Sequence, residues 1–202
     1  MKTMFIPAKA KTEISKNKIF EISKKLPKKI AIVYSIQYQD TARKVKEILS
    51  ECHQITSLTQ VLGCSNPKFP TSTEALLLIG SGKFHAVSLA FETKLPIYIL
   101  NKDNLEKVSE QEVQSLEKKH KASKLKFLTS KKIGILISTK PGQENLERAL
   151  SIKKKLKDKK SYMFISNNIN PLEFENFGLD CWINTACPRI DFNAQVINMN
   201  EI

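Results

Sequence analysis

Cysteine has the most distinctive chemistry of the residue types in this 202-residue chain, and Cys187 occupies the most suggestive position. It follows a short apolar run, 179–183, that is typical of a buried strand, and Pro188 and Arg189 come directly after it. Because ligands of open α/β sheets bind beyond the carboxyl ends of the strands, a thiol in that loop is a candidate ligand. The alternative is a small residue buried at a strand end, since free cysteine is among the most buried residue types.

A second cysteine, Cys64, ends the loop at 60–64. The remaining two, Cys52 and Cys181, fall at an expected helix end and inside an expected strand. No two of the four form a CxxC pair, which argues against a zinc knuckle. Their number would allow two disulfides, but cysteine in a reducing compartment is more often metal-binding or catalytic.

The composition predicts a folded cytoplasmic protein. Hydrophobic residues make up 41% of the chain, which is enough for a core. No apolar run approaches the ~20 residues that cross a bilayer, and the apolar segment at the start is too short for a secretory signal. We therefore expect no membrane segment.

Two glycine loops also follow expected strands and open expected helices: 80–83 and 140–143. The first is not a phosphate loop, because Leu77 and Phe84 stand where that motif needs glycine and Ser or Thr. Backbone N–H groups at such a helix start still suit an anionic group. The alternative for both loops is a tight turn that the glycines permit. His85, in the first turn of its helix, is either a ligand or a structural histidine.

Strands alternate with helices along the chain, which predicts an α/β fold with mostly parallel sheets flanked by helices. We expect two small lobes, 1–128 and 129–202, whose strand-end loops face a shared cleft. The expected strands are 3–6, 29–35, 74–79, 96–100, 132–138, 162–165 and 179–183, with a further strand within 192–202. The expected helices are 13–26, 40–51 capped by Asp40 or Thr41, 83–93, 109–121, 144–157 and one from Asn170 to Gly178.

The net charge of +13 favours acidic partners. The excess is mostly lysine spread over helical faces, and its densest run, 153–160, has the pattern of a solvated helix end. Aromatic residues are not interleaved with it, as single-strand binders require. Nucleic acid is therefore not the expected partner, and a basic RNA- or ribosome-binding module is kept as an alternative function.

Four motifs in register resemble the diphthamide synthase family, the 2-(3-amino-3-carboxypropyl)histidine synthases, in its archaeal form. They span nearly the whole chain. The motifs are Gln60-Val61-Leu62-Gly63-Cys64, Gly80-Ser81-Gly82-Lys83-Phe84-His85, Ser138-Thr139-Lys140-Pro141-Gly142-Gln143 and Thr185-Ala186-Cys187-Pro188-Arg189.

The resemblance implies three similar α/β domains, each giving one cysteine to a single [4Fe–4S] cluster, with the fourth iron open to S-adenosylmethionine. It implies an S-adenosylmethionine-dependent 3-amino-3-carboxypropyltransferase that modifies a histidine of elongation factor 2 through a radical. Cys64 and Cys187 would be the ligands from the second and third domains. The residues that would bind S-adenosylmethionine are Thr139, Lys140, Gly142, Gln143, Arg189, Gly80 and His85, with Arg189 suited to a carboxylate.

The chain also departs from the family pattern. It has no counterpart of the first domain or its cysteine, and Cys52 and Cys181 match no ligand position. Ser65 and Ser81 replace a usual aspartate, and Ser138 replaces a usual glycine. We therefore expect the C-terminal portion of a split enzyme, active with a separate chain that supplies the missing domain. The alternative is a non-catalytic subunit that binds a homologous diphthamide synthase.

Overall fold

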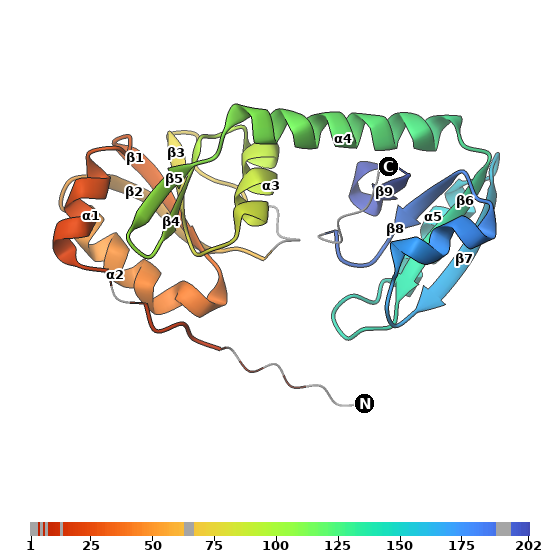
Figure 1. Cartoon of the computed structure of the whole chain (residues 1–202), viewed down its shortest axis with the longest axis horizontal. Helices are drawn as coiled ribbons and strands as arrows, with labels where there is room; N and C mark the ends of the chain where they lie inside the picture. The colour runs from red at the N-terminus through yellow and green to blue at the C-terminus, as the bar shows by residue number, and fades with distance from the viewer. Residues whose placement is uncertain (1–3, 5, 7, 13, 63–66, 189–194) are drawn as a thin grey trace. The chain divides into compact units, whose positions relative to one another are not determined.

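The computed structural model describes residues 4, 6, 8–12, 14–62, 67–188 and 195–202 (Figure 1). The chain divides into two compact units, Met1–Leu116 and Glu117–Ile202. The division falls inside the long helix α4 (Glu110–Thr129), whereas the predicted lobes of 1–128 and 129–202 placed that helix almost entirely with the first. Each unit has its own sheet and core, as an α/β fold with mostly parallel sheets requires.

The first unit contains a five-stranded sheet in the order β2-β1-β3-β4-β5. Its strands are β1 (Lys29–Tyr34), β2 (Gln54–Gln60), β3 (Ala75–Ile79), β4 (Ile97–Asn101) and β5 (Asn104–Lys107). The first four are parallel, and β5 is antiparallel to β4. The apolar runs of β1 and β3 are buried on both faces because helices cover the sheet on each side. Those helices are α1 (Lys16–Ser23) and α2 (Gln39–Leu49) on one face and α3 (Lys83–Thr93) on the other.

The second unit contains a four-stranded, all-parallel sheet in the order β7-β6-β8-β9. Its strands are β6 (Lys132–Ser138), β7 (Lys160–Ser166), β8 (Cys181–Asn184) and β9 (Val196–Asn198). Helix α5 (Leu146–Lys155) and Phe127 of α4 pack on one face. The aromatic residues of the 3-10 helix η2 (Pro171–Phe177) pack on the other. The strand expected within 192–202 is confirmed as β9.

Several predicted boundaries were wrong for local reasons. A 3-10 turn, η1 (Ile36–Tyr38), precedes α2, so Asp40 lies in the first helical turn and does not cap it. Helix α1 begins later than expected because Ser15 caps it, its hydroxyl accepting from the backbone N–H of Lys18. The segment after Asn170 is a 3-10 helix, although Gly178 ends it at a positive φ as expected. None of the helices in the described ranges is long and apolar enough to cross a membrane.

Packing in the second unit centres on Trp182, which is fully buried. Its ring stacks on Phe174 with the ring centroids 4.5 Å apart. On the neighbouring strand it lies opposite Gly134, and a Cβ built there would overlap the indole ring. Gly134 is therefore required by space, since the large ring fills the volume that a side chain would need.

We expect Gly134→Ala to lower the free energy of unfolding by about 1–3 kcal/mol, the usual cost of overpacking a core. Denaturant unfolding followed by tryptophan fluorescence and circular dichroism would measure this loss. Repeating the substitution in a Trp182→Phe background, followed by circular dichroism alone because Trp182 is the one tryptophan of the chain, provides the control, since a smaller ring should relieve the overlap. An equal loss in both backgrounds would show that the overlap is not the cause.

Candidate functional site

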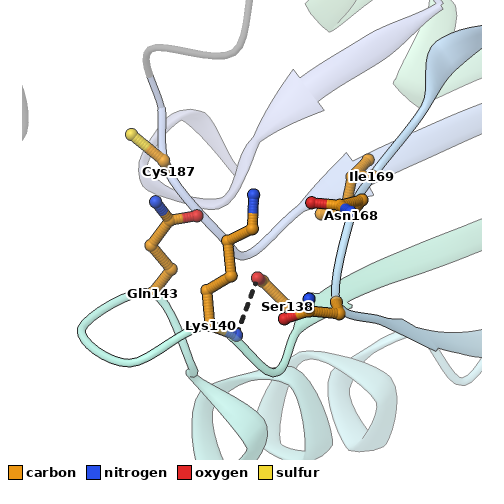
Figure 2. Close-up of a pocket in the computed structure, with 7 residues that line it drawn as sticks. Ser138, Lys140, Gln143, Asn168, Ile169 and Cys187 are labelled. Atoms are coloured by element: carbon orange, nitrogen blue, oxygen red, sulfur yellow. Dashed lines mark hydrogen bonds between the residues drawn. The ribbon is translucent and has the colours of Figure 1, made fainter. Parts of the chain in front are cut away.

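The loops at the carboxyl ends of β6, β7 and β8 form a pocket of about 270 Å³ in the second unit (Figure 2). This volume is at the small end for ligand pockets, which suits one end of a larger ligand. The pocket is lined by Ser138, Lys140, Gln143, Asn167, Asn168, Ile169 and Cys187. Three of these residues, Lys140, Gln143 and Cys187, were predicted site residues, and the structure brings them together.

Cys187 is held in place by the buried amide of Asn184 at the end of β8. The Asn184 side-chain NH₂ donates to the Cys187 carbonyl oxygen and to Oδ1 of Asn198, both at 2.9 Å. Its side-chain oxygen accepts from the backbone N–H of Ala186 at 3.0 Å. A single amide therefore fixes the loop on both sides of the cysteine and links it to the end of β9. Sequence analysis located Asn184 at the start of the Cys187 loop but assigned it no structural or functional role.

The loop after β6 is a tight turn joined to the cysteine loop. The backbone N–H of Gln143 donates to the Lys140 carbonyl at 3.0 Å, and Gly142 provides the positive φ of +79°. The side-chain NH₂ of Asn145 donates to the carbonyl of Thr185 at 2.8 Å, which connects the two loops. The tight turn expected from the sequence is therefore present, and it lies beside the pocket; a ligand-binding role for this loop stays a prediction.

Five of the seven described residues that line the pocket have hydroxyl, amide or ammonium side chains, and Lys140 is the only charged one among them. Figure 2 shows Lys140 extending between the Gln143 amide and Asn168. The Ser138 hydroxyl accepts from the backbone N–H of Lys140 at 3.2 Å, a contact that glycine at 138 would lose. An ammonium, amides and a hydroxyl together suit a ligand group that carries a carboxylate.

Thr139 supports the pocket without lining it. Its hydroxyl donates to Oδ1 of Asn167 at 3.5 Å, and its backbone N–H donates to the Ser166 carbonyl. These bonds join the loops after β6 and β7. The contribution of the β7 loop was missed by sequence reasoning, because asparagines after a strand are equally typical of a simple turn.

The predicted residues Gly80 and His85 lie in the first unit, where β3 leads into α3. Gly80 has a φ of +151°, packs near the ring of Tyr38 and donates its backbone N–H to the Leu100 carbonyl. His85 falls in the first helical turn as expected, with its ring against Gly82. Ligand-binding roles for both residues stay predictions.

Cys64 and Arg189 lie outside the described residues. The expected meeting of Cys64 with Cys187, and the expected carboxylate contact of Arg189, therefore stay predictions. Among the described residues, no group of three or more His, Cys, Asp or Glu side chains could hold a metal ion.

The three described thiols are all free but differ in accessibility. Cys181 is fully buried, and burial raises the pKa of its thiol to about 11. Cys52 is exposed at the end of α2 and lines no described pocket, whereas Cys187 is partly exposed at the pocket. Because metals bind the thiolate, Cys187 suits the role of a cluster ligand and Cys181 does not.

Comparisons with known proteins identify the family to which this chain belongs. Residues 1–196 match the family model described as "Putative diphthamide synthesis protein". The 2-(3-amino-3-carboxypropyl)histidine synthase of Pyrococcus horikoshii is 30% identical over 203 residues, covering 93% of this chain and 59% of that protein. The synthase of the same name from Methanocaldococcus jannaschii is also 30% identical, covering 100% of this chain and 59% of that protein.

Two solved structures resemble the chain closely. Dph2 from Pyrococcus horikoshii superposes with a TM-score of 0.81 at 28% identity, covering 98% of this chain and 63% of that one. A structure of Dph2 from Pyrococcus horikoshii with a 4Fe-4S cluster gives a TM-score of 0.77 at 29% identity, covering 92% and 59%.

The fold and the loops define a two-unit α/β protein with a thiol at the carboxyl end of a parallel sheet. The chain belongs to the diphthamide synthesis family, and its curated relatives are named as synthases. It spans about 60% of the length of those relatives.

The difference in burial predicts selective alkylation of the native thiols. Iodoacetamide at pH 8 should modify Cys52 and Cys187 and leave Cys181 unmodified, because a thiol with a pKa of about 11 has very little thiolate at that pH. Peptide mass spectrometry would report the sites. Modification of Cys181 at the rate of Cys52 would contradict its burial.

The raised pKa of the Cys181 thiol also predicts how the stability of the fold depends on pH. The folded state keeps the Cys181 proton up to about pH 11, whereas the unfolded state loses it near the ordinary value of 9.0. The unfolded state therefore binds fewer protons between these values, and the free energy of unfolding should fall as pH rises from 9 to 11. Denaturant unfolding at pH 8 and 10 would measure the fall. Cys181→Ala is the control, since it should remove this part of the pH dependence.

Asn184→Asp should lower the free energy of unfolding by about 1–3 kcal/mol, because it removes two donated hydrogen bonds and places a carboxylate beside two oxygen atoms. Asn168→Asp makes the same chemical change at an exposed position and should have little effect. Denaturant unfolding compares the two variants. Equal effects would contradict a special role for the buried amide.

Proposed function

We propose that this chain performs part of the first step of diphthamide biosynthesis. In this reaction a 3-amino-3-carboxypropyl group is transferred from S-adenosylmethionine to a histidine of elongation factor 2. One observation carries the proposal: an accessible thiol, Cys187, anchored at the carboxyl end of a parallel sheet in a chain of the diphthamide synthesis family. The reducing cytoplasm, where thiols stay free, is the proposed location.

Cys187 and Cys64 are the proposed ligands of a [4Fe–4S] cluster. Support comes from the accessibility of Cys187 and from the related structure that contains a 4Fe-4S cluster. Such a cluster, when bound, supplies the electron that breaks the sulfonium bond to the aminocarboxypropyl group. Orientation of that group is the task of the protein.

The pocket is the proposed site for the aminocarboxypropyl end of S-adenosylmethionine. Lys140 supplies a positive charge for the carboxylate, and Arg189 is proposed to add a second. Gln143 offers a donor and an acceptor, and the turn at Gly142 keeps this side chain at the pocket. The volume of about 270 Å³ is consistent with holding only this end of the molecule.

A separate chain is the proposed source of the third cysteine ligand. Neither remaining cysteine of the 202 residues is suitable, since Cys181 is fully buried and Cys52 lies at the end of α2, outside the described pocket. Several relatives are named as subunit 1 of the synthase, and the one from Gallus gallus is 24% identical over 179 residues. Their name supports an assembly of more than one chain, and it also favours the alternative of a non-catalytic partner subunit.

Co-expression with a small α/β chain that carries one strand-end cysteine tests the proposal. The pair, purified without oxygen, should hold about four iron atoms and transfer a labelled aminocarboxypropyl group to elongation factor 2. Cys64→Ser or Cys187→Ser should remove most of the iron and the transfer. Cys52→Ser is the matched control and should retain both.

Two outcomes would contradict the proposal in different ways. A pair that assembles but binds no iron would refute the split-enzyme arrangement. Full transfer activity with Cys187→Ser would instead support the alternative of a non-catalytic subunit.

A further inference from the structure

The amino ends of the strands in the second unit carry lysines that the sequence separates widely. Strand β6 begins at Lys132 and β7 at Lys160, and these two residues are directly paired in the parallel register. The backbone N–H of Lys160 donates to the Lys131 carbonyl at 2.8 Å. Lysines nearly thirty residues apart therefore lie on adjacent strands, about 4.8 Å from each other along the edge.

The carboxyl ends of two helices reach the same edge. The Lys159 ammonium donates to the carbonyl oxygens of Phe127, Leu128 and Ser130, at 3.1, 3.0 and 2.6 Å, and so fixes the end of α4 beside the start of β7. The last turn of α5 adds three more lysines just before this point. We call the whole set the lysine rim: Lys124, Lys126, Lys131, Lys132, Lys153, Lys154, Lys155, Lys157, Lys159 and Lys160.

Little negative charge compensates the lysine rim. Its segments and the adjoining start of β8 contain two acids, Asp158 and Asp180, so ten lysines leave a net charge of +8 out of +13 for the chain. The Asp180 carboxylate accepts from the backbone N–H groups of Lys131 and Lys132 at 2.9 and 2.8 Å, which keeps its pKa low. Within the described residues, no lysine of the rim forms an ion pair. The Lys159 ammonium is taken up by three backbone carbonyls, and the other nine lysines of the rim are exposed and available to a partner.

We propose that the lysine rim binds the phosphate backbone of a nucleic-acid duplex. Lysine ammonium groups bind phosphates as point charges without reading bases. The rim segments contain no arginine, and their one aromatic residue, Phe127, is buried. Protein interfaces are enriched in arginine and aromatic residues, and single-strand sites need exposed rings for stacking, so a duplex backbone is the partner that fits best.

This surface is separate from the pocket. The pocket lies at the carboxyl ends of β6, β7 and β8, whereas the rim lies at their amino ends. Because β6 and β7 are each seven residues long, the pocket and the lysine rim lie about 20 Å apart. Changes in the rim should therefore leave iron binding by the assembled enzyme unaffected, so the two proposals can fail independently.

Fluorescence anisotropy of the full chain with a labelled 20-base-pair RNA duplex tests the proposal, with a DNA duplex of the same sequence as a second probe. The rim variant changes four exposed lysines to glutamine: Lys131, Lys132, Lys157 and Lys160. The matched control changes four exposed lysines of the first unit: Lys24, Lys25, Lys44 and Lys46. Circular dichroism would establish that both variants are folded.

The rim variant should bind the duplex at least about tenfold more weakly at ~100 mM salt. The slope of log affinity against log salt concentration should be smaller in magnitude by about 2–4 for this variant than for the wild type. The control should stay within about twofold of the wild type. Lys153→Gln, Lys154→Gln and Lys155→Gln combined provide a second rim variant that leaves the strand starts unchanged. It should also weaken binding.

Equal losses in the rim variants and the control would overturn the proposal, because binding would then follow overall charge. Binding to polyglutamate or to phosphatidylserine vesicles as tight as to the duplexes would also overturn it. Leu125 and Leu128, exposed on α4 beside the rim, make the vesicle comparison necessary. A preference for RNA or DNA would identify the source of the backbone and would support the proposal in either case.

Discussion

The hydrogen bonds of one buried amide, Asn184, hold the candidate site together. An amide in an apolar interior is costly unless its donors and acceptor are satisfied. Asn184 meets this condition by bonding to the Cys187 and Ala186 backbone and to the side chain of Asn198. Asn184 is the last residue of β8, so the packing of β8 fixes the position of this amide and, through it, the position of the thiol.

Successive residues of strand β8 pack on opposite faces of the sheet. Cys181 and Ile183 enter the core beneath α5, while Trp182 enters the aromatic core beside η2. Asn184 then follows at the polar end of the strand. Cys181 lies within the strand and faces the core, whereas Cys187 lies in the loop beyond the strand end, which explains why these two cysteines differ so much in chemistry. Burial raises the pKa of the Cys181 thiol, whereas Cys187 reaches the pocket.

The sequence predicted what depends on local pattern. Continuous apolar runs located β3 and β6, and the loop of Cys187 followed from the run before it. Features that depend on distant partners were missed. The partner of Asn184 lies 14 residues away, and the polar strand β5 forms only because β4 is available to pair with it. The expectation of an iron–sulfur cluster came from family resemblance, because no cysteine spacing within this chain indicates one.

The lysine rim is a second feature that the sequence alone could not predict, because it depends on contacts between distant segments. Along the sequence, the run 153–160 has the ordinary pattern of a solvated helix end, and the lysines near 131 are unrelated to it. The parallel register of β6 and β7 brings the two groups together, and Lys159 fixes the end of α4 beside them. A parallel sheet has chemically different ends, because every strand starts at one edge and finishes at the other. In this unit the finishing edge gathers a thiol, neutral polar groups and the single charge of Lys140, while the starting edge gathers many lysines, so one short sheet presents two chemically different surfaces.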